Sequence, residues 1–293
     1  MTTVSVSGDR FAGRALTCGP LTDQLMQLAG EVRQSPLFPE AERKFTESVV
    51  KFRLAGPRLV NKLLGKDARI RIVSLCHCLH ERSLKRGEDG RVAAAEIVDI
   101  IENTLGGSKQ IVNTTLDMMV AMQLLSKEAG RRQRHFLPTA RLVALLRSWY
   151  SAMAAHVDHV DPDGRRSERF EKDDGIFEQM AAYMGNAFVA GESLTGRVPE
   201  LAGFNRHDYG WAVLNVATVS AYAITTLPSI RSIASLFHIP KSQVAVILND
   251  AFQEGLLERR NSAGVWPTRQ LTDSYSKWVS ISFAFWILAS RKG

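Results

Sequence analysis

Two separate stretches of the chain carry polar side chains that can neutralise anions and form paired hydrogen bonds. The first set is Ser108, Lys109, Gln110, Asn113 and Thr114. The second set is Lys241, Ser242, Gln243, Ala245 and Asn249, in which Ala245 alone is apolar. Ammonium groups neutralise phosphates, and amide side chains form two parallel hydrogen bonds with the edge of a planar base. These residues therefore predict noncovalent recognition of a polyanion that carries bases.

Arginines follow each polar set along the chain. Arg131, Arg132 and Arg134 follow the first set, and Arg259 and Arg260 follow the second. The whole chain has a formal net charge of +7 and a sequence pI near 9.5, which favours an anionic partner. Because diffuse basicity is weak evidence, the arginines close to the two polar sets carry more weight than the total charge.

Residues 229–268 contain the elements that would position the second set. Ile230, Ala234 and Phe237 recur at helical spacing and predict a short helix, with a small residue where another helix crosses it. Pro240 suits the first turn of that second helix. The second helix has a stripe of apolar residues that are expected to be buried, namely Val244, Ile247, Leu248, Ala251 and Phe252. The second polar set is left on its exposed faces.

A two-stranded hairpin is predicted after this pair of helices. Residues 256–260 form one strand, residues 261–264 are typical of a turn, and residues 265–268 return as the other strand. Helix, tight turn, helix and hairpin together resemble the winged helix-turn-helix transcription regulators of bacteria, broadly those of the multiple-antibiotic-resistance regulator (MarR) type. Such regulators usually have glycine where His238 stands, so either the turn differs or His238 adopts a positive φ.

The same pattern occurs earlier in the chain. Leu124 and Leu125 correspond to Leu256 and Leu257, residues 136–139 correspond to 265–268, and Trp149 corresponds to Trp278. The number of residues between equivalent positions of the two copies is three larger before the predicted hairpin than after it. The tip of a hairpin tolerates such a difference in length. This alignment places Lys109 opposite Lys241 and predicts two winged-helix modules in tandem.

These patterns predict a mainly α fold with small β-hairpin wings, in which two tandem winged helix-turn-helix domains follow an N-terminal helical arm. The predicted parts are a flexible N-terminus (1–20), the arm (21–66), the first module (67–157), a linker with a helix (158–207) and the second module (208–293). The charged residues 158–174 are expected to be an exposed linker. The arm is expected either to pack on the first module or to form a dimer. The aromatic C-terminal helix is expected to meet residues 211–227 or another subunit.

Other clusters and segments favour structural roles. Cys76 and His80 would share one face of a helix while Cys78 points elsewhere, so no metal site is expected. The chain has no phosphate-binding loop, dinucleotide fingerprint or nucleophile elbow, so neither a cofactor nor enzymatic activity is expected. The apolar residues 211–227 and 278–290 are too polar and too short, respectively, to span a membrane. Three cysteines without framework spacing suit a reducing cytoplasm.

The resemblance implies a bacterial transcription regulator that binds double-stranded DNA in the cytoplasm, at the nucleoid. The two polar sets and the arginines that follow them are the expected DNA contacts. Further expected partners are a second copy of the chain, through its apolar helices, and RNA polymerase or another regulator. Two alternatives stay open: a plasmid-type replication initiator, which also binds DNA through tandem winged helices, and a winged-helix scaffold that binds other proteins.

Overall fold

The computed structural model describes residues 22–56, 58–105, 107–128, 134–172, 175–260 and 264–291. The first helices are α1 (Thr22–Gln34), α2 (Phe38–Ala55), α3 (Arg58–Leu63), α4 (Asp67–Lys85), α5 (Ala94–Leu105), α6 (Lys109–Ala121) and α7 (Ala140–Val160). The later ones are α8 (Arg166–Lys172), α9 (Ile176–Val189), α10 (Ala202–Arg206), α11 (Gly210–Tyr222), α12 (Ile230–Phe237), α13 (Lys241–Gln253) and α14 (Arg269–Arg291). Short 3₁₀ turns are η1 (Pro162–Gly164), η2 (Thr195–Arg197) and η3 (Pro199–Leu201). The prediction of a mainly helical fold is confirmed, whereas the predicted flexible segment 1–20 lies outside the described residues.

The strands form two small antiparallel sheets. They are β1 (Val92–Ala93), β2 (Leu125–Lys127), β3 (His135–Pro138), β4 (Leu257–Arg259) and β5 (Val265–Pro267). The first sheet has the order β1-β3-β2, and the second pairs β4 with β5, so that Leu257 faces Pro267. The strand β1 was not predicted from the sequence. It extends the first hairpin and ties the chain before α5 to the end of that hairpin.

Both halves of the chain run through the same order of elements. In the first half, α4 and β1 precede the helix pair α5–α6 and the hairpin β2–β3. In the second half, α11 precedes the helix pair α12–α13 and the hairpin β4–β5. Leu227 N–H, before α12, donates to the carbonyl of Val265 at 2.9 Å, at the place where β1 pairs with β3 in the first half. The internal repeat in the sequence therefore corresponds to two similar local arrangements.

The turn between α12 and α13 contains His238, for which the sequence left two alternatives. His238 has φ 53° and ψ 46°, so it adopts the left-handed conformation. This outcome confirms one of the two alternatives for His238. Ile239 is buried beneath the turn, and Pro240 caps the N-terminus of α13. A histidine can therefore take the place of glycine while the two helices keep their tight connection.

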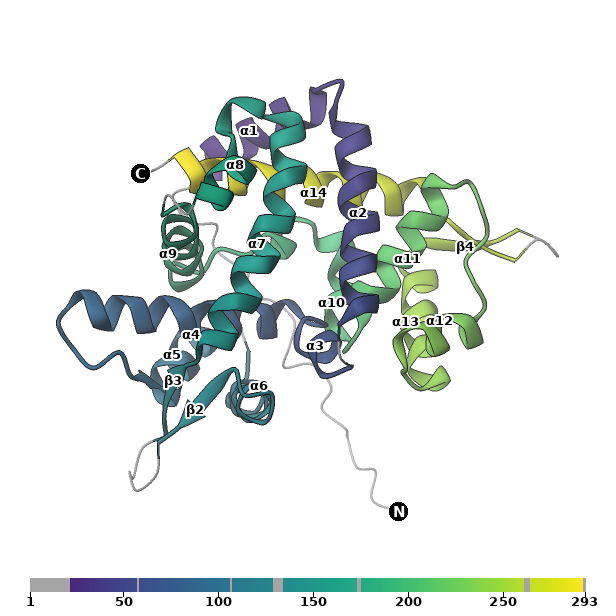
Figure 1. Cartoon of the computed structure of the whole chain (residues 1–293). Coiled ribbons are helices and arrows are strands. Elements are labelled where there is room, and N and C mark those ends of the chain that lie inside the picture. Colours follow the sequence, from purple (N-terminus) through teal and green to yellow (C-terminus); the bar gives the residue numbers. More distant parts are fainter. Residues whose placement is uncertain are drawn as a thin grey trace, which may run out of the picture.

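Helix α14 is the element against which both halves pack (Figure 1). Its residues from Val279 to Ser290 are all buried, so it has no exposed face over that length. Aromatic rings from the first half and the second half meet it: Tyr150 lies 5.0 Å from Trp286, and Trp211 lies 4.5 Å from Trp278, between ring centroids. The expected contact between the C-terminal helix and residues 211–227 is thus present within a single chain.

The predicted helical arm consists of α1, α2 and α3. Helix α1 packs along α14, and α2 packs against both α7 and α11. Phe45 of α2 has its ring centroid 5.5 Å from that of Phe283. The arm therefore packs on the first module, which is one of the two expected alternatives, and α1 and α2 also pack on α14 and α11 of the second half.

The segment 158–174 is not the exposed linker that its charge predicted. Arg166 has no exposed surface, and its guanidinium donates to Asp158 Oδ1 at 3.0 Å, to Asp161 Oδ2 at 2.6 Å and to Ser290 Oγ at 2.8 Å. Phe170 of α8 is buried as well. A buried guanidinium is tolerated when carboxylates neutralise it and its donors are satisfied. Arg166 therefore forms a buried ion-pair cluster with Asp158 and Asp161, next to Ser290 of α14.

We expect Arg166→Ala to lower the free energy of unfolding by about 3 kcal/mol, because Asp158 loses its buried cation and Asp161 keeps only its ion pair with the more exposed Arg291. Urea unfolding of the purified chain measures this change. Arg165→Ala is the matched control, because the guanidinium of Arg165 is mostly exposed and is expected to contribute little to stability. Equal losses in the two variants would contradict the structural role of Arg166.

Candidate nucleic-acid interface

Helix α6 presents the first polar set on its outer face. Val112, Leu116 and Met119 are buried beneath it, which leaves Lys109, Gln110 and Thr114 exposed. Ser108 caps the helix, because its hydroxyl accepts the N–H of Ile111 at 3.4 Å. The carboxylate of Glu102 in α5 accepts the N–H of Lys109 at 2.9 Å. Side chains of α6 rather than its first amide groups are therefore available to a ligand.

A cluster that the sequence did not predict holds the first hairpin against α6. Arg134 donates to Asn113 Oδ1 at 2.9 Å, and its guanidinium also pairs with Asp117. The same guanidinium lies 5.3 Å from the centre of the Phe136 ring. Arg134 and Asn113, both predicted DNA contacts, therefore pair with each other within the chain. Asp117 lies one helical turn after Asn113, so the two side chains share one face of α6. That spacing is the signal in the sequence that could have revealed this cluster.

Two lysines around α6 remain exposed and have no ion pair among the residues that the structure describes. They are Lys109, at the start of α6, and Lys127, in β2. Arg141 is also exposed and donates to Gln123 Oε1 at 3.2 Å. The predicted contacts Arg131 and Arg132 lie outside the described residues. Exposed cations on both the helix and the hairpin can contact phosphates without a desolvation penalty.

A groove of about 710 Å³ runs beside the exposed face of α6. Gln110, Thr114 and Asp117 of α6 line it. Lys62 of α3, Lys66 and Arg69 line it as well, and the sequence analysis missed these three residues because they belong to the predicted arm and its border. The groove therefore combines polar side chains of α6 with three basic residues from another part of the chain.

Helix α13 presents the second polar set less completely. Lys241, Ser242 and Asn249 are exposed, and Ala245 is half-buried. Gln243 is not free, because its amide donates to the carbonyl of Asp208 at 2.7 Å. Gln243, a predicted DNA contact, therefore already uses one amide donor within the chain. No side chain caps the N-terminus of α13, which begins after Pro240.

Asp208 links the two candidate surfaces. Its carboxylate lies 2.9 Å from Arg69 Nη1 and 3.4 Å from Lys66 Nζ, and both of these residues line the groove. Its carbonyl accepts the amide of Gln243 in α13. Beside it, His207 Nε2 lies 2.7 Å from Asp250 Oδ2, which also holds α13 to the segment before α11. The position of α13 is therefore coupled to that of α4 through one residue.

The second hairpin carries the two predicted arginines on its surface. Arg260 pairs with Glu258 at 2.7 Å and covers the ring of Trp266 at 5.0 Å. Arg259 lies over the ring of Phe252, 5.4 Å from its centre. Both guanidinium groups are exposed, but the charge of Arg260 is partly neutralised by its neighbour.

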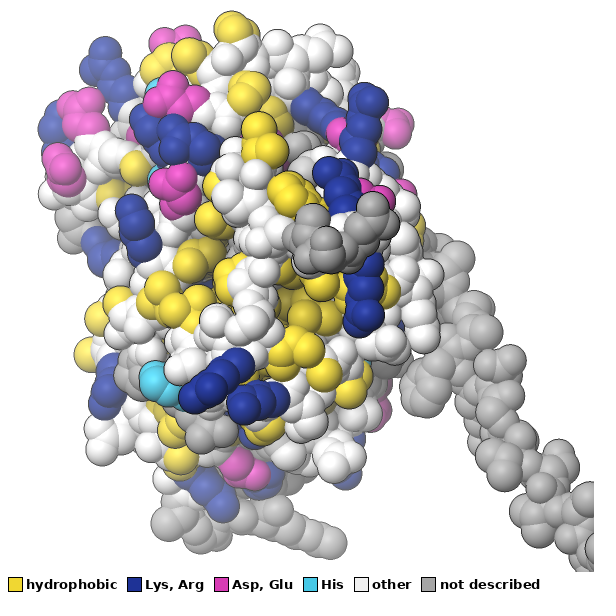
Figure 2. All heavy atoms as spheres, turned by 90° about the vertical axis from the view of Figure 1, so that its right-hand side faces the viewer, with side chains coloured by type: hydrophobic (Ala, Val, Ile, Leu, Met, Phe, Trp, Pro, Cys, Tyr) yellow, Lys and Arg dark blue, Asp and Glu magenta, His cyan; other side chains and the backbone are white. Residues whose placement is uncertain are grey.

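Apolar side chains are also exposed around α12 and α13. Figure 2 shows hydrophobic side chains along the middle of the face to which these helices belong, with Lys and Arg side chains around them. Val246 of α13 is 51% exposed, and Leu236 of α12 is 41% exposed. Ile224, which precedes α12, is 81% exposed. The second helix pair is therefore less polar at its surface than the first.

The cysteines and histidines of α4 lie in the core. Burial raises the pKa of the Cys76 thiol to about 12, so the thiolate does not form near neutral pH. The ring of His77 packs on Phe177, with 5.3 Å between centroids, and burial lowers the pKa of His77. Within the described ranges, no three His, Cys, Asp or Glu side chains are grouped to hold a metal ion, and no helix has the length and apolarity needed to cross a membrane.

We expect Asp208→Ala to loosen the contact between the two halves, because Arg69 and Lys66 lose their shared carboxylate. The free energy of unfolding should fall by about 2 kcal/mol. Hydrogen exchange should quicken in residues 62–70 and 207–213, since these segments flank the lost ion pairs. Asp163→Ala, which removes an exposed carboxylate, is the control. Unchanged exchange in both segments would show that Asp208 does not link them.

No protein-family model, curated protein or solved structure matches this chain. A proposal for its function therefore depends on the geometry of the two helix pairs and on the charge around them. That geometry offers exposed cations, hydroxyls and amides for noncovalent binding of an extended anionic partner.

Proposed function

We propose that the two helix pairs with their hairpins are winged helix-turn-helix modules, and that the chain is a bacterial transcription regulator that binds double-stranded DNA. The observation that carries this proposal is the repeated arrangement of helix, turn, helix and antiparallel hairpin. In each repeat the second helix begins with an exposed lysine, Lys109 or Lys241. A helix of this kind enters the major groove and reads base edges from its first turns.

The first module has the stronger features for DNA binding. Gln110 and Thr114 on α6 supply hydrogen-bonding groups for base edges, and Lys109 supplies a cation for guanine or phosphate. Lys62, which lines the groove, and Lys127 on β2 flank α6, where the phosphates on both sides of a major groove would pass. Arg134 then acts by holding the hairpin to α6 through Asn113 and Asp117.

The two modules lie in a fixed relation that supports a single composite site. Figure 1 shows α6 and α13 on the same side of α14. The core around α14 and the contacts of Asp208 restrict movement of one module against the other. Gln110 corresponds to Ser242, and Asn113 to Ala245, so the two helices offer different groups to DNA. The proposed site is therefore asymmetric.

A second candidate role applies to the second module alone. The exposed apolar side chains of Leu236 and Val246 favour contact between α12–α13 and another protein, such as RNA polymerase or another regulator. In that case the first module alone would bind DNA. A replication initiator would use the same DNA contacts as a regulator, but at repeated origin sites.

We expect Lys109→Ala and Lys241→Ala to remove protection from different halves of one DNA footprint, because each lysine belongs to a different recognition helix. Each substitution should weaken binding by about 1–3 kcal/mol if the lysine contacts a base. Hydroxyl-radical footprinting on a bound genomic fragment measures both effects. Lys51→Ala, which removes an exposed lysine from α2 and leaves both helix pairs unaltered in sequence, is the control.

Two outcomes of this footprinting would change the assignment. Loss of protection over the same half in both variants would overturn the model with two DNA-reading helices. No effect of Lys241→Ala, together with a clear effect of Lys109→Ala, would assign the second module to a protein partner.

A further inference from the structure

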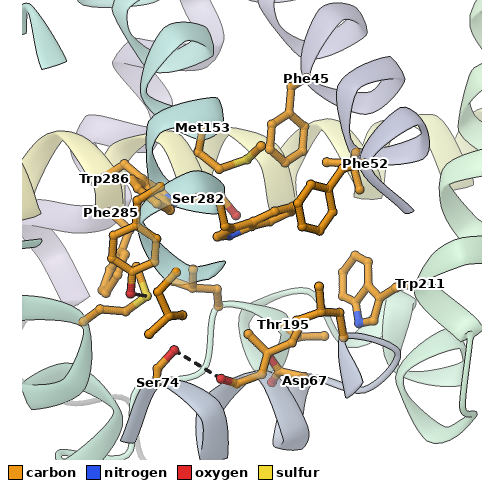
Figure 3. A pocket seen from close by; sticks show the side chains of 18 of the residues that line it. Phe45, Phe52, Asp67, Ser74, Met153, Thr195, Trp211, Ser282, Phe285 and Trp286 are labelled. Atoms are coloured by element: carbon orange, nitrogen blue, oxygen red, sulfur yellow. Dashed lines mark hydrogen bonds between the residues drawn. The ribbon is translucent and has the colours of Figure 1, made fainter. Parts of the chain in front are cut away.

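A cavity of about 150 Å³ lies between the two halves, among α2, α4, α7, α11 and α14 (Figure 3). Figure 3 shows Phe52 and Trp211 on one side of it and Phe285 and Trp286 on the other, with Ser74 and Thr195 beneath. Four of the five tryptophans of the chain line this cavity: Trp149, Trp211, Trp278 and Trp286. A cavity of this volume with apolar walls accommodates a ligand about the size of benzene.

One cation in the cavity wall has no anionic partner in the described part of the chain. Arg53 of α2 is 5% exposed, and its Nη2 donates to the carbonyl of Leu64 at 2.9 Å. Its Nε and Nη1 are buried and find no hydrogen-bond partner among the residues that the structure describes. Asp67, the carboxylate that also lines the cavity, pairs with Arg71 instead. Burial lowers the pKa of Arg53 to about 10, so the guanidinium is still charged at neutral pH.

A second buried donor lies in the same wall. The indole N–H of Trp278 has no partner among the described residues, while the ring itself packs on Trp211. Buried donors without partners cost free energy, and a buried charge without a counterion costs more. A ligand that offers oxygen acceptors to these donors would remove that cost.

We propose that this cavity binds a small aromatic carboxylate with a single ring, whose carboxylate pairs with Arg53. A carboxylate oxygen can accept a charge-assisted hydrogen bond from the unpaired Nη1 of Arg53 and supplies the counterion for the buried guanidinium. The surrounding rings offer edge-to-face and stacked contacts to one aromatic ring. Volume excludes long fatty acids, and the unpaired guanidinium disfavours neutral ligands. Binding here does not depend on the proposed DNA function.

Titration of the full chain with benzoate tests this proposal through the fluorescence of the tryptophans in the cavity wall. We expect saturable binding of benzoate, and binding of benzamide that is weaker by about tenfold or more, because benzamide lacks the charge. Arg53→Met should weaken benzoate binding to a similar extent. Lys51→Met, which removes an exposed cation two residues away on the same helix, should leave it unchanged.

A cavity-filling variant keeps the test decisive if Arg53→Met does not fold. Val49→Phe retains Arg53 but places a ring in the cavity, and it should abolish the fluorescence change with benzoate. The proposal is overturned if the wild-type chain shows no saturable response to benzoate. Equal binding of benzoate and benzamide, or full benzoate binding by Val49→Phe, would overturn it as well. Because the titration contains no DNA, each of these outcomes is separate from the test of DNA binding.

Discussion

The burial of α14 on all sides is the constraint on which the rest of the structure depends. Twelve consecutive residues, Val279 to Ser290, have no exposed face, so packing elements must surround them. Helices α1, α7, α9 and α11 come from distant parts of the chain and supply this packing. Apolar burial of this extent is the main favourable term in folding. As a result, the two similar helix pairs become parts of one body rather than two independent units.

This shared core determines what the two candidate surfaces can do. Helices α6 and α13 are both held to this core, so a partner that contacts both of them must match their spacing as well as their side chains. Two further features lie at the junction between the halves. Asp208 connects the groove of the first half to α13. The cavity beside Arg53 contains buried hydrogen-bond donors that have no partner among the described residues. A ligand in that cavity would contact α2, α7, α11 and α14 at once. Any effect of such a ligand on the proposed DNA binding would act through these four helices.

The local elements could be predicted from the sequence, whereas the long-range pairs could not. Helical periodicity and Pro240 located α12 and α13, and the internal repeat located the first helix pair. The same reasoning took the charge of residues 158–174 as a sign of exposure, although Arg166 is buried on Ser290 from the far end of the chain. Gln243 and Arg134 were predicted DNA contacts, and each also forms a hydrogen bond with a distant residue of the chain. Such pairs join residues that are distant in sequence, and no local pattern encodes them.

The most direct test of the central claim is to sequence the genomic fragments that the purified chain retains at low and moderate salt. The account predicts enrichment of one asymmetric DNA motif with two different halves. Binding should fall with rising salt by a log-log slope of about −0.9 for each phosphate contact, since neutralised phosphates release counterions. Repeated identical motifs at a replication origin would favour an initiator. Retention without any enriched motif, or binding that does not respond to salt, would contradict sequence-specific DNA recognition.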